Sequence, residues 1–188
     1  MREELEKNLI QKYPEFFQGH KLPPTESLMC FGCECDDGWY KIIDDLCGYI
    51  KKLINSDHTI GVKDEFYTKD KEHWEDNIVY LPAPEVIFTQ IKEKYATLRV
   101  YFYIRAMHQD FPGREKLDLD KAEAYYWQLD QRIQSAVDFA EYISGKTCEV
   151  TGAPGNLHSR GGWFKTLCPE KAQELSYVPL WVPVIEED

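Results

Sequence analysis

Residues Gln90 to Ile104 read QIKEKYATLRVYFYI, and this stretch decides the fold. From Leu98 onward, apolar side chains alternate with cationic and phenolic ones, which is the two-residue period of a half-buried β-strand. Val86 to Ile91 has the composition of an antiparallel partner strand, and Lys92 to Ala96 is predicted to connect the two. The sequence therefore predicts a small antiparallel sheet centred on residues 86 to 104.

The second face of this strand carries Arg99, Tyr101, Tyr103 and Arg105. Guanidinium groups bind phosphates through paired hydrogen bonds, and aromatic rings stack on bases. One hypothesis is that Arg99, Tyr101 and Tyr103 bind an anionic or aromatic ligand. The alternative is a face that is solvated or covered by a helix.

Two main helices are predicted to pack on the sheet. Residues 39–54 and 120–144 each repeat apolar side chains at three- and four-residue spacing. Asp36 or Asp37 is expected to cap the first helix. The stripe on the second would also suit a coiled coil with a partner, but it spans barely three heptads, which favours core packing. The predicted fold class is α+β, with residues 1–188 forming a single domain.

Composition restricts the classes of function. The chain has 188 residues, 14% of them aromatic, and a formal net charge of −11. This charge opposes direct binding to nucleic-acid phosphates and suits a basic protein partner or mimicry of nucleic acid. The charged amino-terminal residues contain no apolar run, so neither a signal peptide nor a membrane span is expected. The sequence predicts a cytosolic protein.

Cysteines are numerous for a cytosolic chain, where free thiols or metal ligands are commoner than disulfides. Cys30, Cys33 and Cys35 lie within six residues of one another. They provide three of the four ligands of a zinc site, and Cys47 is the fourth only if the following helix folds back. Otherwise these cysteines are small packing residues.

Acidic side chains gather in two segments that lie outside the predicted core. Residues 55–83 are polar and irregular, which predicts a surface excursion, and residues 178–188 form an extended tail. Carboxylates in these segments are candidate contacts to a basic partner, or else solvated loop residues. They are Asp64, Glu65, Glu72, Glu75, Asp76, Glu186, Glu187 and Asp188.

The segment from Cys148 to Cys168 suggests two further kinds of site. Arg160, Trp163 and Lys165 flank a glycine pair and form a second candidate group for binding a nucleotide. A cysteine nucleophile needs a nearby base, and His158 lies in the same segment. A single cysteine–histidine coincidence is weak support for catalysis, so no catalytic residue is assigned.

Four blocks resemble, in the same order, a family of small proteins that is widespread in bacteriophages and prophages. The blocks are residues 13–17, 35–47, 90–101 and 148–168, and they are distributed along the chain apart from the 55–83 excursion and the tail. The resemblance implies no general activity. It implies the cytoplasm of an infected bacterium as the location, and Ala96, where the family usually has glycine, implies that the turn need not require positive φ.

In that family the last block looks like a zinc knuckle, with two pairs of ligands three residues apart. Here Thr151 and Lys171 occupy the second position of each pair, so two of the four ligands are missing. The resemblance implies that residues 147–171 form a degenerate knuckle held by Trp163 and Leu167, with Cys148 and Cys168 close together as thiols. Zinc would then be retained only if Cys30, Cys33, Cys35 or a histidine joined Cys148 and Cys168.

These observations favour a non-catalytic phage-type accessory protein that binds and inhibits a host factor. The candidate target is a defence nuclease such as a CRISPR effector, whose basic groove an acidic anti-CRISPR protein would occupy. The alternative is a sponge that binds a nucleotide signal and so counters host defence. No cofactor is assigned, and zinc binding at the degenerate knuckle is left as an alternative.

Overall fold

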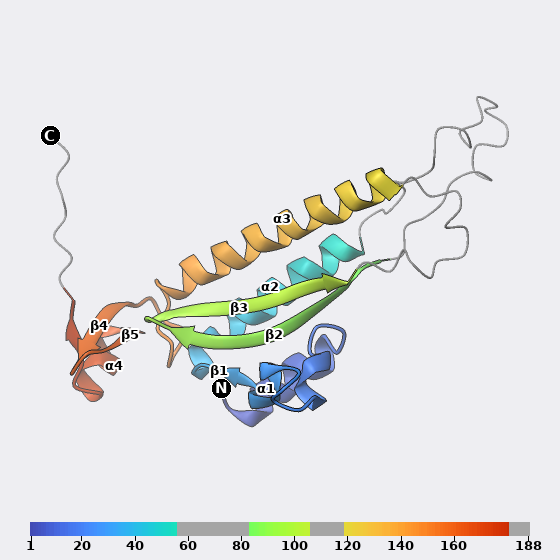
Figure 1. Cartoon of the computed structure of the whole chain (residues 1–188). Coiled ribbons are helices and arrows are strands. Elements are labelled where there is room, and N and C mark those ends of the chain that lie inside the picture. The colour runs from blue at the N-terminus through green and yellow to red at the C-terminus, as the bar shows by residue number, and fades with distance from the viewer. Residues whose placement is uncertain (56–82, 106–118, 181–188) are drawn as a thin grey trace, which may run out of the picture.

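The computed structural model describes residues 1–55, 83–105 and 119–180 and has an α+β fold (Figure 1). Helices and two three-stranded sheets alternate along the chain. The α-helices are α1 (Glu3–Lys12), α2 (Tyr40–Ile54), α3 (Leu119–Ser144) and α4 (Pro169–Glu174). The strands are β1 (Cys33–Glu34), β2 (Glu85–Lys94), β3 (Thr97–Arg105), β4 (Asn156–Arg160), β5 (Trp163–Leu167) and β6 (Val178–Pro179). Short 3-10 helices are η1 (Gln18–Lys21), η2 (Leu28–Phe31) and η3 (Asp37–Trp39).

The first sheet has the order β1-β2-β3 and contains the predicted hairpin, β2 antiparallel to β3. The predicted alternation is confirmed, because Leu98 and Val100 are buried while Tyr101 and Tyr103 are exposed. The strand β1, which pairs parallel to β2, was not predicted. Two residues are too few to show a period of two.

The hairpin turn differs from the prediction. β2 continues to Lys94, so only Tyr95 and Ala96 form the turn, and both have positive φ, 53° and 64°. This is the backbone of a tight two-residue hairpin, which usually selects glycine or asparagine. Ala96 tolerates it because its amide donates to the Glu93 carboxylate (2.6 Å) and its carbonyl accepts from the Thr166 hydroxyl (2.7 Å). Ala96 therefore adopts a positive φ, which its departure from glycine did not require of the turn.

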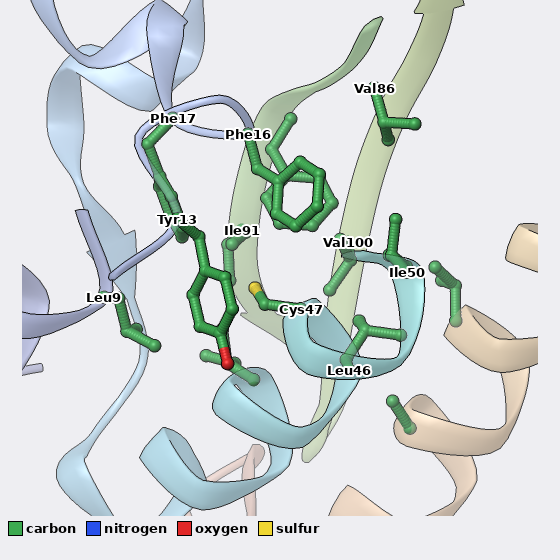
Figure 2. Packing of buried hydrophobic residues seen from close by; sticks show 14 of the residues in the cluster. Leu9, Tyr13, Phe16, Phe17, Leu46, Cys47, Ile50, Val86, Ile91 and Val100 are labelled. Carbon is green, nitrogen blue, oxygen red and sulfur yellow. The ribbon is translucent and has the colours of Figure 1, made fainter. Parts of the chain in front are cut away.

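The two predicted helices are confirmed and lie along the hairpin (Figure 1). Figure 2 shows Leu46, Cys47 and Ile50 of α2 directed at the strand residues Ile91 and Val100. All five side chains are buried, and the apolar spacing of α2 places its three on the helix face that packs against the core. Burying this face provides the main stabilisation of the fold.

The open edge of β3 is covered by α3. The Ser144 hydroxyl accepts a hydrogen bond from the Leu98 amide (2.8 Å), and the Glu141 carboxylate accepts one from the Val100 amide (3.3 Å). Unpaired amides on an edge strand would otherwise be free to pair with another chain. Two polar side chains of α3 thus close this part of the sheet edge.

A smaller carboxyl-terminal unit follows α3. Its sheet has the order β5-β4-β6, all antiparallel, and its buried cluster is separate from the main core. Leu167 is fully buried there, as predicted, but Trp163 is 76% exposed beside the β4–β5 turn. The prediction that Trp163 holds this unit together is therefore wrong. The predicted extended tail is seen as the edge strand β6, and residues 181–188 lie outside the described residues.

The joint between the two units includes hydrogen bonds that backbone carbonyls of the carboxyl-terminal unit accept. The Gly38 amide donates to the Glu149 carbonyl (2.7 Å), and the indole nitrogen of the fully buried Trp39 donates to the Thr147 carbonyl (2.9 Å). Asp36 and Asp37 do not cap α2, whose cap residue is Trp39. They pair instead with Lys165 and Arg2, respectively.

Candidate functional site

An apolar groove lies between α2 and α3, with a volume of about 540 Å³. Its walls combine residues of α2, namely Ile42, Asp45, Leu46 and Tyr49, with residues of α3, namely Arg132, Ser135, Ala136, Phe139, Ala140 and Ile143. Ala136 and Ala140 have the smallest apolar side chains on this part of α3. Because they stand where α3 meets α2, space stays open between the helices.

Aromatic side chains stand at the rim of this groove. Phe139 is 64% exposed and Tyr49 is 47% exposed, while Tyr142 is also exposed nearby on α3. Aromatic residues and arginine are enriched in the centres of protein–protein interfaces. Sequence analysis missed this site, since Phe139 falls outside the apolar stripe of α3 and exposure has no periodic signal.

The residues predicted to bind a ligand on β3 have different contacts, so they do not act as one group. Arg99 donates to the Glu141 carboxylate (3.2 Å) and to the Thr97 hydroxyl (2.6 Å), so its guanidinium holds α3 against the sheet. Tyr101 and Tyr103 are exposed, and the Lys92 ammonium lies 5.5 Å from the centre of the Tyr101 ring. Arg99 is committed to a structural role, which weakens this face as an anion site.

The second predicted group lies in the carboxyl-terminal unit and not on β3. Arg160 and Lys165 line a pocket of about 590 Å³ together with Arg2, Lys171 and Tyr177. The Arg160 guanidinium stacks 4.7 Å from the centre of the Tyr177 ring and donates to the Leu175 carbonyl. Trp163, the third member of the group, does not line this pocket.

Acidic residues offset the cations of this pocket. Lys165 contacts the carboxylates of Asp36 (2.8 Å) and Glu149 (3.0 Å), and Glu149 is only 3% exposed. Burial opposes the charge of Lys165, but these two hydrogen bonds outweigh it and raise the pKa of Lys165. Burial also raises the pKa of Glu149, although Lys165 and the Asp36 amide stabilise its charged form. The pocket is thus close to neutral rather than strongly cationic.

The amino-terminal cysteines do not form the predicted zinc site. Burial raises the pKa of Cys33, and it raises the pKa of Cys35 to about 12, which is typical of inert packing thiols. Within residues 1–55, 83–105 and 119–180, no three histidine, cysteine or acidic side chains are placed to hold a metal ion together. Cys30, Cys33 and Cys35 therefore do not join Cys148 and Cys168 around zinc, because the former belong to the main core and its surface.

Cys148 and Cys168 do lie together, as the sequence suggested, in the buried cluster of the carboxyl-terminal unit. Burial raises the pKa of Cys148, but hydrogen bonds from the Thr151 side chain and from the amides of Cys168, Thr151 and Val150 outweigh it, so the pKa is lowered. Zinc does not fit here, since Thr151 and Lys171 stand where further ligands are needed.

His158 is buried on β4, where its Nδ1 lies 2.8 Å from the Asn156 carbonyl oxygen. Among the described residues, no hydrogen bond joins its ring to Cys148 or Cys168. The geometry gives no support to a cysteine–histidine pair. The acidic candidates at 64–76 and 186–188 lie outside the described residues.

Comparison with models of protein families, with curated proteins and with solved structures finds no match to this chain. The resemblance to phage proteins therefore stays a prediction. In the parts of the chain that the structure describes, no helix has the length and apolar character needed to cross a membrane. The α2–α3 groove and the pocket near Arg160 are two candidate functional sites of the described residues.

Proposed function

We propose that this protein is a non-catalytic, phage-type binding protein that attaches to a host protein and inhibits it. The observation that carries the proposal is the α2–α3 groove with Phe139 and Tyr49 exposed at its rim. Exposed apolar surface that is rimmed by polar residues is typical of protein interaction sites. The site of action is the cytoplasm of an infected bacterium.

The partner segment is defined by the chemistry of the groove and its surroundings. Its apolar side chains would enter between Leu46 and Ala140, while its basic side chains would face an acidic surface. Acidic residues outnumber basic ones along α3, and the whole chain carries a net charge of −11. These charges favour a nucleic-acid-binding enzyme such as a defence nuclease, whose basic groove attracts an acidic protein.

Replacing Phe139 with aspartate tests this function. We expect binding to a defence nuclease to weaken by at least about tenfold, because a charge would enter the apolar groove and an interface aromatic would be lost. Binding and nuclease inhibition would be measured against a panel of purified bacterial nucleases, including CRISPR effectors. Raised salt should slow association of the wild type, because the charge attraction is screened.

Trp127 provides the matched control, because it is also 64% exposed on α3 but does not line the groove. Trp127→Asp should bind as the wild type does. Equal loss in both variants would contradict a role of the groove. A wild-type protein that neither binds nor inhibits any nuclease of the panel would contradict the proposed target class.

A nucleotide sponge is the second candidate, supported by the arrangement of Arg160, Tyr177 and Lys165 around the second pocket. A bound nucleotide signal would raise the melting temperature by mass action. We expect any such shift, measured with a panel of cyclic nucleotides, to disappear in Arg160→Ala and persist in Arg105→Ala. No shift with any nucleotide would contradict the sponge.

A further inference from the structure

Another pocket of the carboxyl-terminal unit is lined by residues of β4, α4 and β6, and its volume is about 360 Å³. Some of its residues are buried and form its floor, while the others are exposed and form its mouth. The floor consists of His158, Ala172 and Tyr177, and the mouth consists of Asn156, Pro169, Gln173 and Pro179. Only Tyr177 is shared with the pocket near Arg160, and none of these residues lines the α2–α3 groove.

The side chain of His158 lies on the face of β4 that meets Tyr177. Side chains two residues apart on a strand point to the same face, and Arg160, two residues further on, stacks against the Tyr177 ring. The Nδ1 atom of His158 lies 2.8 Å from the Asn156 carbonyl oxygen, which can only accept, so Nδ1 carries a proton. In the neutral ring the other nitrogen, Nε2, is therefore a hydrogen-bond acceptor.

This acceptor is buried in the lining of the pocket. His158 is only 5% exposed, and among the described residues no donor pairs with its Nε2 atom. Buried polar atoms in folded proteins nearly always have a hydrogen-bond partner, because leaving one unpaired is costly. A donor on a molecule that enters the pocket would provide this partner.

The other walls define the shape and polarity of that molecule. Tyr177 provides an aromatic ring, and Ala172 and the two prolines provide apolar surface. The lining residues other than His158 are all uncharged. Such walls favour a flat, uncharged ring. At the mouth, the side-chain amides of Asn156 and Gln173 offer donors and acceptors to the polar edge of such a ring.

We propose that this pocket binds a small flat heterocycle of the nucleobase class, whose ring N–H donates to His158 Nε2. The ring packs against Tyr177, and its carbonyl groups accept hydrogen bonds from the amides of Asn156 and Gln173. The volume suits a small molecule rather than a folded peptide segment. Binding here depends neither on the α2–α3 groove nor on phosphate contacts at Arg160, because a free base carries no phosphate.

The test is a titration of the isotope-labelled full chain with uracil, followed by NMR. We expect saturable shifts of signals from β4, α4 and β6, with a dissociation constant of about 1 mM or below for a ligand of this size. Uracil methylated at both ring nitrogens has no N–H donor and should bind at least about tenfold more weakly. His158→Phe keeps a ring but loses the acceptor, so its affinity for uracil should fall by a similar factor.

Two glutamine variants complete the test. Gln173→Ala should weaken uracil binding by about threefold, because one polar contact at the mouth is lost. Gln131→Ala makes the same change at an exposed position of α3 outside the pocket and should bind as the wild type does. Gln173 is exposed, so this variant and the methylated base keep the proposal falsifiable if His158→Phe does not fold.

Three results would overturn the proposal. The first is the absence of any saturable shift at millimolar uracil, which would leave only water to pair with Nε2. The second is equal affinity for uracil and for its methylated form. The third is a folded His158→Phe variant that binds uracil as tightly as the wild type does.

Discussion

Gly38→Ala is expected to lower the free energy of unfolding by about 3 kcal/mol or more. An added Cβ would lie 2.6 Å from the Glu149 carbonyl oxygen, and closer still to the Cys148 carbonyl oxygen and the Gly152 amide nitrogen. All three atoms belong to the backbone, so no side chain can turn aside to make room. The methyl group would push the carboxyl-terminal unit away from η3 and break the Gly38–Glu149 hydrogen bond.

Gly48→Ala is the matched control for this prediction. Gly48 lies within α2, and an added Cβ there meets only the Tyr13 hydroxyl, at 3.3 Å. Alanine is favoured over glycine inside a helix by about 0.5 to 1 kcal/mol, so this variant should be unchanged or more stable. Urea unfolding, followed by tryptophan fluorescence, measures the free energy of unfolding of both variants. Equal stability of the two variants would show that the joint at Gly38 is loose.

The elements of the main core were predictable because each has a strong local period. Alternation predicted β3, and three- and four-residue spacing predicted α2 and α3 to within a residue or two. The turn was not predictable, since Tyr95 and Ala96 adopt positive φ only because Glu93 and the distant Thr166 bind the Ala96 backbone. Tertiary contacts here override local preference.

The chemistry of the site was less predictable than the fold, because its partners are far apart in sequence. Arg99 and Lys165 suggested phosphate ligands, but Glu141 and Glu149 neutralise them. The sequence has no signal for such pairings. The groove was also not predicted, since Phe139 falls outside the apolar stripe of α3 and its exposure leaves no pattern in the sequence. Convergence of Cys148 and Cys168 was predicted, because both lie in one short segment.

Lys165→Met is expected to destabilise the protein by about 3 kcal/mol at neutral pH, since it leaves the buried Glu149 carboxylate without its cation. The loss should depend on pH. A carboxyl whose pKa is raised on folding contributes stability that is present below its unfolded value of 4.5 and is lost as pH rises through the folded pKa. Without Lys165 the pKa of Glu149 rises further, so the variant should regain part of its stability near pH 5.

Two further variants, compared by urea unfolding at both pH values, test whether lost charge or lost packing destabilises Lys165→Met. The double variant Lys165→Met/Glu149→Gln should recover part of the loss at neutral pH, because no buried charge is left unpaired. Lys171→Met removes a cation whose partner Glu174 is solvent-exposed, so its stability should change little. If Lys165→Met were equally unstable at both pH values and the double variant recovered nothing, Lys165 would stabilise the joint through its alkyl chain. A loss that shrinks towards pH 5 and is relieved by Glu149→Gln would instead establish that Lys165, which also pairs with Asp36 of the main core, stabilises the carboxyl-terminal unit by neutralising the buried Glu149 carboxylate.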